Sequence, residues 1–203
     1  MKDLIILVAD LDTENVLKGL LPRLEHVCGT RNFSFDLRRH INRDPGCLNE
    51  SADFLRPFSN QYHHALVVFD KEGCGQESQA REELETKVAD ALASNGWQEE
   101  KVAAIVVDPE IENWMWLNSP HVSKALNWEE SQSLYAWLVE NGWRRENASK
   151  PDRPKEAMET VLKKTRKPRS ASIYKSIAEN VSFSKCEDQA FLKLLDKLKT
   201  WFG

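Results

Sequence analysis

The sequence predicts an α/β fold with a central, mostly parallel sheet flanked by helices and followed by a helical C-terminal extension. Three short apolar runs, at residues 5–9, 65–69 and 103–107, are rich in β-branched residues and continuous rather than alternating. Such runs are typical of strands buried on both faces of a parallel sheet. Segments with apolar residues at helical spacing separate the runs, which is the alternation expected of this fold class.

Acidic residues follow all three runs: Asp10 and Asp12, then Asp70 and Glu72, then Asp108, Glu110 and Glu112. The carboxyl ends of parallel strands line one edge of a sheet, where ligands bind. Crowded carboxylates repel each other, and a hard divalent cation with oxygen ligands relieves the repulsion. The pattern therefore predicts a Mg²⁺ site. The alternative is that Asp12 and Asp108 are helix caps and the other acids are solvated in loops.

The first half of the chain contains clear start and stop signals. Asp12 is placed to cap the helix after the first run, Pro22 predicts a kink in it, and Gly29 predicts its end. Residues 33–37 alternate like a half-buried strand. A loop with one short helix near 48–55 should follow, and Gly96 should end a charged helix over 77–94.

The second half is predicted to be mainly helical. Asp108 and Pro109 are expected to be the N-cap and first residue of a helix, with Glu110 in its first turn. The apolar residues 114–117 predict core packing, with a base-stacking platform as the alternative. Capping boxes at 127–130 and 184–187 predict two further helix starts, and Gly142 should end the first of these helices. A helix is also expected near 156–164. We expect a core over 1–120 and an extension over 121–203, packed together as one unit.

Charge is distributed unevenly along the chain. The net charge is −4, so no overall basic charge indicates nucleic-acid binding. However, residues 69–112 hold twelve acids and four bases, whereas residues 141–175 hold eleven bases and four acids. A basic segment facing an acidic metal edge suits a protein that holds DNA or RNA phosphodiesters over bound cations. The proposed backbone contacts are Lys163, Lys164, Arg166 and Lys167; the alternative is a solvated, charged linker and helix face.

Cysteine usage and the N-terminal sequence predict a cytoplasmic location. The four cysteines are far apart without any CxxC pairing, which favours reduced thiols. The N-terminal apolar run is too short for a signal peptide or a membrane span. We therefore expect no membrane contact.

The motifs at these strand ends resemble a known family. The order of elements is similar to the Toprim fold of topoisomerases, primases and overcoming-lysogenization-defect-type nucleases. Residues 8–14, 20–23, 68–72 and 109–114 more closely resemble an uncharacterised Toprim-like bacterial family found often in antiphage defence loci, among which components of methylation-associated defence systems are candidates. The resemblance covers nearly the whole chain and rests on short motifs.

The resemblance implies roles for the acids. Toprim domains usually carry a glutamate after the first strand as general acid/base and an Asp-x-Asp pair after the third as Mg²⁺ ligands. Here these positions are Asp10 and the pair Asp70 and Glu72. Aspartate is one methylene shorter than glutamate, which would withdraw the base by roughly 1.5 Å. Glu110 is then the second catalytic candidate and Glu112 a further metal ligand, with Mn²⁺ as the alternative ion.

These observations predict a component of an antiviral defence system that acts as a Mg²⁺-dependent Toprim-like nuclease, together with other defence proteins. The first alternative is a non-catalytic subunit that binds nucleic acid or protein through a degenerate Toprim site. A phosphohydrolase of small nucleotides is the third. No Walker-type phosphate loop is present, which weakens an ATPase interpretation.

Overall fold

The computed structural model describes residues 1–184 and 186–203, with Val27 described for its backbone only. Four strands form one sheet in the order β2-β1-β3-β4, and every neighbouring pair is parallel. The strands are β1 (Lys2–Val8), β2 (Phe35–Arg39), β3 (Tyr62–Asp70) and β4 (Val102–Val107). The predicted α/β class with a parallel sheet is confirmed, and the arrangement is consistent with a Toprim-type fold.

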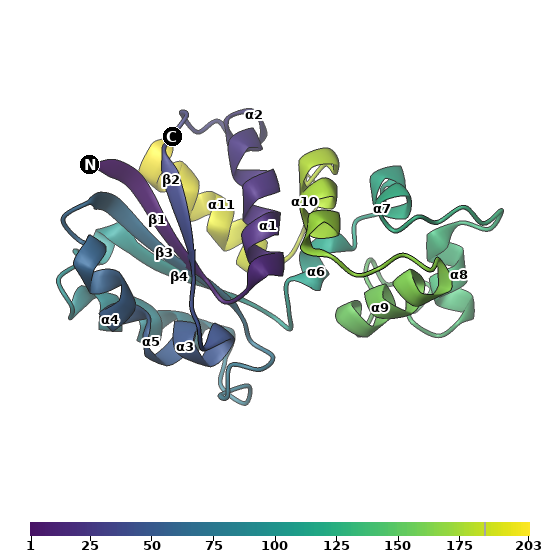
Figure 1. Cartoon of the computed structure of the whole chain (residues 1–203), viewed down its shortest axis with the longest axis horizontal. Coiled ribbons are helices and arrows are strands. Elements are labelled where there is room, and N and C mark those ends of the chain that lie inside the picture. Colours follow the sequence, from purple (N-terminus) through teal and green to yellow (C-terminus); the bar gives the residue numbers. More distant parts are fainter. Residues whose placement is uncertain (185) are drawn as a thin grey trace.

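Helices surround the sheet and extend to one side of it (Figure 1). The first five are α1 (Leu11–Leu20), α2 (Leu24–Cys28), α3 (Arg43–Asn49), α4 (Ser51–Leu55) and α5 (Arg81–Ala93). The others are α6 (Glu112–Met115), α7 (Pro120–Ala125), α8 (Leu134–Glu140), α9 (Pro154–Lys164), α10 (Ala171–Asn180) and α11 (Gln189–Phe202). Short 3-10 helices lie at Leu21–Arg23, Arg56–Phe58 and Glu99–Lys101. No helix in the described part of the chain is long and apolar enough to cross a membrane.

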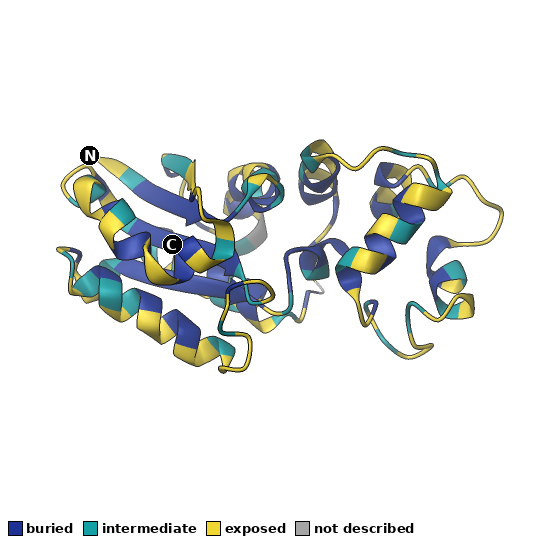
Figure 2. Cartoon of the chain, turned by 60° about the horizontal axis from the view of Figure 1, so that its bottom comes forward, coloured by how far each residue is buried: buried dark blue, intermediate teal, exposed yellow. Residues whose placement is uncertain are grey.

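Both faces of the sheet are covered, as the continuous apolar runs predicted. Alternate residues of β1 point into two separate hydrophobic clusters, with Leu4 and Ile6 in one and Ile5 and Leu7 in the other. The first cluster packs under α1, α10 and α11, and the second packs under α3, α4 and α5. The strands are buried along most of their length, and exposed residues gather on the outer faces of the helices (Figure 2).

The helical segment between β4 and α11 belongs to the same hydrophobic cluster as one face of the sheet. Trp114 and Trp116 are fully buried in this cluster, as predicted for the apolar residues 114–117. The last helix, α11, then returns to the sheet beside β4 (Figure 1). Its Phe202 ring stacks on Phe33 with 4.2 Å between the ring centroids.

Several proline and glycine residues interrupt or end helices where the sequence predicted. A 3-10 turn begins at Leu21 with Pro22 in its first positions, and Gly29 ends α2 in the left-handed region at φ 75°. Gly96 and Gly142 also have positive φ, and the backbone N–H of the tryptophan after each bonds back to the preceding helix.

The predicted helix caps were wrong at four places. Asp10, not Asp12, caps α1, because that helix starts directly after the strand. Asp108 caps no helix, because the carbonyls of Val107 and Pro109 accept bonds from the turn after β3. The helix therefore starts only at Glu112, and Glu110 lies in the loop before it. Ser133 and Asp188, rather than the predicted boxes, cap α8 and α11. Helix α10 was not anticipated.

Gly19 lies where α1 and α10 approach most closely. A Cβ atom at this position would come within 2.8 Å of the Lys175 carbonyl oxygen and 2.9 Å of the Ala178 Cβ. Overpacking of this kind costs about 1–3 kcal/mol. We expect Gly19→Ala to lower the melting temperature by about 2–12 °C, measured by thermal denaturation. Lys18→Ala, on the exposed side of α1, is the control and should change it by no more than about 2 °C. Equal melting temperatures for Gly19→Ala and wild type would contradict this packing.

Candidate metal centre

Three carboxylates converge at the carboxyl edge of the sheet. Asp70 ends β3, Glu110 lies in the loop after β4, and Glu112 is the first residue of α6. Each offers an oxygen atom, and these three oxygens all lie within 4.8 Å of one another. We call these residues the acidic triad. Oxygen ligands in this number and spacing are close enough to hold a metal ion.

Asp70 is the triad residue whose negative charge has the fewest compensating contacts among the described residues. Its Oδ1 atom is buried and has no hydrogen-bond partner among the described residues. Burial raises the pKa of Asp70 well above its ordinary value, and the neighbouring Asp44 and Glu112 raise it further. Asp44 also accepts a 2.8 Å hydrogen bond from the backbone N–H of Asp70, which fixes the turn after the strand. An unpartnered, buried carboxylate oxygen is costly unless a proton or a cation occupies it.

Glu110 and Glu112 are both buried, and each is held by a cation. Glu110 accepts hydrogen bonds of 3.1 Å from both the backbone N–H and the Nζ of Lys155. Glu112 Oε1 accepts from the Tyr174 hydroxyl at 2.6 Å and from Arg169 at 3.0 Å. Burial raises the pKa of both glutamates despite these contacts. Burial alone would lower the pKa of Lys155, but its bond to Glu110 and the nearby Glu112 raise it overall.

Asp10 and Asp12 lie beside the triad at the end of β1. Asp10 Oδ1 accepts a 2.8 Å bond from the Thr13 backbone N–H, so one of its oxygens is used in capping α1. Asp12 pairs with Arg169 at 2.9 Å, and its pKa is raised by burial although Arg169 opposes this effect. The same arginine therefore contacts both Asp12 and the triad residue Glu112.

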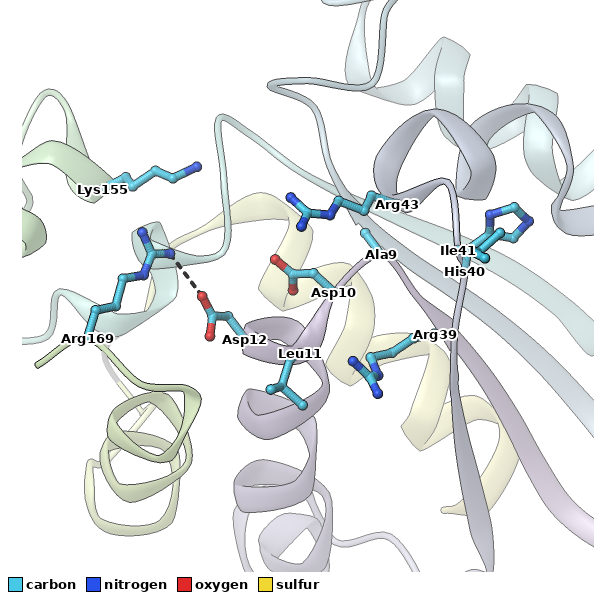
Figure 3. A pocket seen from close by; sticks show the side chains of 10 residues that line it. All are labelled: Ala9, Asp10, Leu11, Asp12, Arg39, His40, Ile41, Arg43, Lys155 and Arg169. Carbon is cyan, nitrogen blue, oxygen red and sulfur yellow. Dashed lines mark hydrogen bonds and ion pairs between the residues drawn. The ribbon is translucent and has the colours of Figure 1, made fainter.

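A pocket of about 660 Å³ opens over Asp10 and Asp12 (Figure 3). Its walls carry five nitrogen-bearing side chains: Arg39, His40 and Arg43 from the end of β2 and the start of α3, and Lys155 and Arg169 from the helical segment. We call this the basic pocket. Because Lys155 and Arg169 also bond Glu110 and Glu112, the pocket adjoins the triad. Cations around carboxylates suit an anionic ligand that is bound together with a metal ion.

Besides Asp10 and Asp12, two further acids predicted at this edge lie outside the triad. Glu72 is exposed, and its backbone N–H bonds the Pro109 carbonyl at 3.0 Å. Asp108 is also exposed and pairs with Lys71 at 2.9 Å. The structure thus brings together Asp70 and Glu112, two of the three predicted metal ligands, with the predicted catalytic residue Glu110.

Two of the four predicted nucleic-acid contacts, Lys163 and Lys164, end α9 far from Lys155, and the other two, Arg166 and Lys167, lie in the turn that follows. Lys163 and Arg166 are exposed, and Lys167 is half-buried. Lys164 pairs with Glu130 at 3.0 Å and lies over the rings of Trp128 and Trp137. The distance along the helix from Lys155 to Lys163 is about 12 Å at 1.5 Å per residue.

Four residues that form hydrogen bonds or ion pairs with the triad were not assigned a role from the sequence: Asp44, Lys155, Arg169 and Tyr174. Asp44 follows β2, a strand that ends in basic residues, so the acidic strand-end signal did not include it. Lys155 and Arg169 were counted only as part of the basic segment. Tyr174 lies on α10, the helix that the sequence did not predict.

We compared the chain with protein-family models, with curated proteins and with solved structures, and found no match in any of the three comparisons.

The raised pKa of Asp70 gives a prediction for pH dependence without metal. The folded protein binds the Asp70 proton more tightly than the unfolded chain, whose pKa is about 4. The stability that the protonated carboxyl contributes is therefore full below about pH 4 and is lost as pH rises through the folded pKa. Asp70→Asn keeps the shape, removes the charge and offers an N–H to the neighbouring carboxylates. In chelator near pH 7.5, we expect this variant to melt about 2–12 °C above wild type.

This difference should shrink towards zero as pH falls to about 4, because wild-type Asp70 is then protonated. Thermal denaturation across this pH range measures it. Asp108→Asn, which removes an exposed acid from the same edge, should show little difference at any pH. A constant difference between Asp70→Asn and wild type at all pH values would show that charge at Asp70 is not the cause.

Proposed function

We propose that this protein is a Mg²⁺-dependent nuclease of the Toprim-like type that acts in the cytoplasm as part of an antiviral defence system. The observation that supports nuclease activity is the acidic triad beside a basic pocket. Both lie at the edge of a parallel sheet where ligands bind in such folds. The defence role rests on the resemblance of the strand-end motifs alone.

The residues at this edge have separable roles in such a reaction. Asp70 and Glu112, with Glu110 beside them, would hold Mg²⁺, and Mn²⁺ would fit the same oxygen ligands. The ion would supply charge stabilisation at the scissile phosphate. Asp10 faces the pocket and is the candidate for accepting a proton from the attacking water. Glu110, held by Lys155, is the candidate for protonating the leaving oxygen.

The cations of the basic pocket support a phosphodiester as the substrate group. Arg39 and Arg43 approach from one side of Asp10, and Lys155 and Arg169 approach from the other. A phosphate between them would exchange the present ion pairs for charge-assisted bonds to its own oxygens. From Lys155, α9 leads to Lys163 and Lys164. The separation of about 12 Å corresponds to roughly three to four nucleotides of a duplex strand, a spacing that would allow these lysines to contact the same backbone as the basic pocket.

One observation favours a non-catalytic binding subunit instead. Lys155 and Arg169 already neutralise Glu110, Glu112 and Asp12 within the chain, which is an arrangement that a site no longer using metal could adopt. In that case the protein would bind nucleic acid or a partner protein without cutting it. Metal binding and cleavage by the isolated protein separate the two proposals.

Metal binding should stabilise the protein by relieving repulsion in the triad. At about one hundred times its dissociation constant, a ligand adds about 2.7 kcal/mol, which corresponds to a rise of roughly 5–11 °C in melting temperature. We expect this rise with millimolar Mg²⁺ or Mn²⁺ in wild type and its near loss in Asp70→Asn and Glu112→Gln. Asp108→Asn should retain it, and Glu72→Gln reports whether that exposed acid also binds the ion.

Cleavage is measured on the same variants with single- and double-stranded DNA and RNA. Wild type should cut at least one of these substrates only with metal, and Asp10→Asn should bind metal but cut at least about a hundredfold more slowly. No metal-induced shift in wild type would contradict the metal centre. A normal shift with no cleavage of any substrate would favour the non-catalytic subunit.

The basic residues beyond the pocket should contribute to nucleic-acid affinity. Replacing Lys163, Lys164, Arg166 and Lys167 with alanine should weaken binding and make it less dependent on salt, because each lost phosphate contact reduces the slope of log K against log[salt] by about 0.7–0.9. Fluorescence anisotropy at several salt concentrations measures the slope. A control double variant on α11, Lys197→Ala with Lys199→Ala, should leave the salt slope unchanged. An identical slope in the quadruple variant would place the contact elsewhere.

A further inference from the structure

A second pocket, of about 560 Å³, lies on the helical segment away from the basic pocket. Three connections that are distant in sequence form it: the one between α6 and α7, the one after α8, and the one between α10 and α11. This volume lies within the range of about 300–1,000 Å³ that is typical of small-molecule sites. None of its lining residues lines the basic pocket.

Arg144 is the clearest sign of a missing ligand here. It lines the pocket, and its Nε atom is buried without a hydrogen-bond partner among the described residues. Its guanidinium carbon lies 5.0 Å from the centroid of the Tyr135 ring, so stacking holds the group in place without satisfying that donor. A buried donor of a charged group is costly when unpaired, and an anionic acceptor is the partner that would relieve it.

Among the described residues, one of the two cations of the pocket is paired with an acid and the other is not. Asp188 is already used: its Oδ1 accepts from Trp114 Nε1 at 2.9 Å, and its Oδ2 accepts from Asn113 at 2.6 Å. Lys150 also lines the pocket, and its Nζ forms an ion pair with Asp188 at 3.8 Å. Arg144 has no acidic partner among the described residues and therefore remains available to an anion that enters from solvent.

The chemistry of the other lining residues indicates which further groups the ligand would carry. Leu117 and Pro120 form an apolar wall beside the buried Trp116. Hydroxyl groups of Ser149, Ser182 and Ser184 and the carboxylate of Glu187 also line the pocket. A ligand that matches all three features has an anionic group, a hydroxylated body and a flat or apolar ring.

We infer that this pocket binds a small organic phosphate of the nucleoside monophosphate class. The phosphate lies against Arg144, with the ion-paired Lys150 beside it, the sugar hydroxyls face the serines and Glu187, and the base packs on Leu117 and Pro120. The site is independent of the acidic triad and needs no metal ion.

Isothermal titration of the whole chain with AMP, in chelator, tests the inference without involving the metal centre. AMP should bind more tightly than adenosine, ribose 5-phosphate or inorganic phosphate, because only AMP offers both the anion and the ring. Arg144→Gln should weaken AMP binding by about 10- to 100-fold. Arg145→Gln changes the neighbouring arginine, which is exposed and pairs with Asp152, and should leave binding unchanged.

Two further variants keep the test decisive. Ser149→Asp adds a negative charge to the pocket without touching the Arg144–Tyr135 stack, so it should weaken AMP binding even if Arg144→Gln unfolds. Arg39→Gln removes a cation from the basic pocket and should have no effect. Loss of binding in Arg39→Gln but not in Arg144→Gln would place AMP in the basic pocket and overturn the inference. Undetectable AMP binding at millimolar concentration, or equal binding of phosphate and AMP, would also overturn it.

Discussion

Burial of the sheet on both faces is the constraint on which the rest of this structure depends. A strand covered by helices on both sides can carry polar side chains only at its ends, so β1, β3 and β4 are apolar along their length and acidic where they stop. Because the strands are parallel, those ends meet at one edge. The same hydrophobic requirement that stabilises the core therefore concentrates charge at a single place, where Asp70 has little access to solvent.

Charge at this edge is balanced by residues from a different part of the chain. Lys155 lies in the first turn of α9 and Arg169 precedes α10, and together they contact Glu110, Glu112 and Asp12. The helical segment thus completes the electrostatics of the sheet edge as well as covering it. An ion or a phosphate that enters must compete with these internal pairs, so the affinity of the site depends on how firmly the connection that carries Arg169 is held. Tyr174, buried beside Glu112, anchors that connection through α10.

The sequence predicted the elements whose signals are local. Continuous apolar runs identified three strands, and glycines at 29, 96 and 142 correctly marked helix ends. It also predicted that Asp70, Glu110 and Glu112 belong to one edge. Cap positions were wrong for different reasons. Asp10 rather than Asp12 caps α1 because the helix starts directly after β1, whereas tertiary hydrogen bonds at Val107 and Pro109 hold the chain against the turn after β3. Asp44, Lys155 and Tyr174 could not be assigned from one sequence, because only the folded chain brings residues that far apart together.

The return of α11 to the sheet has a consequence for how the chain is made. This helix covers β4, a strand synthesised some eighty residues earlier, and Phe202 stacks on Phe33 near the beginning of the chain. Until residues 189–202 have left the ribosome, the part of the sheet face around β4 lacks its cover and exposes valine- and isoleucine-rich surface. The native fold of the sheet can therefore be completed only after α11 has been synthesised, and until then the growing chain is open to aggregation or to chaperone binding.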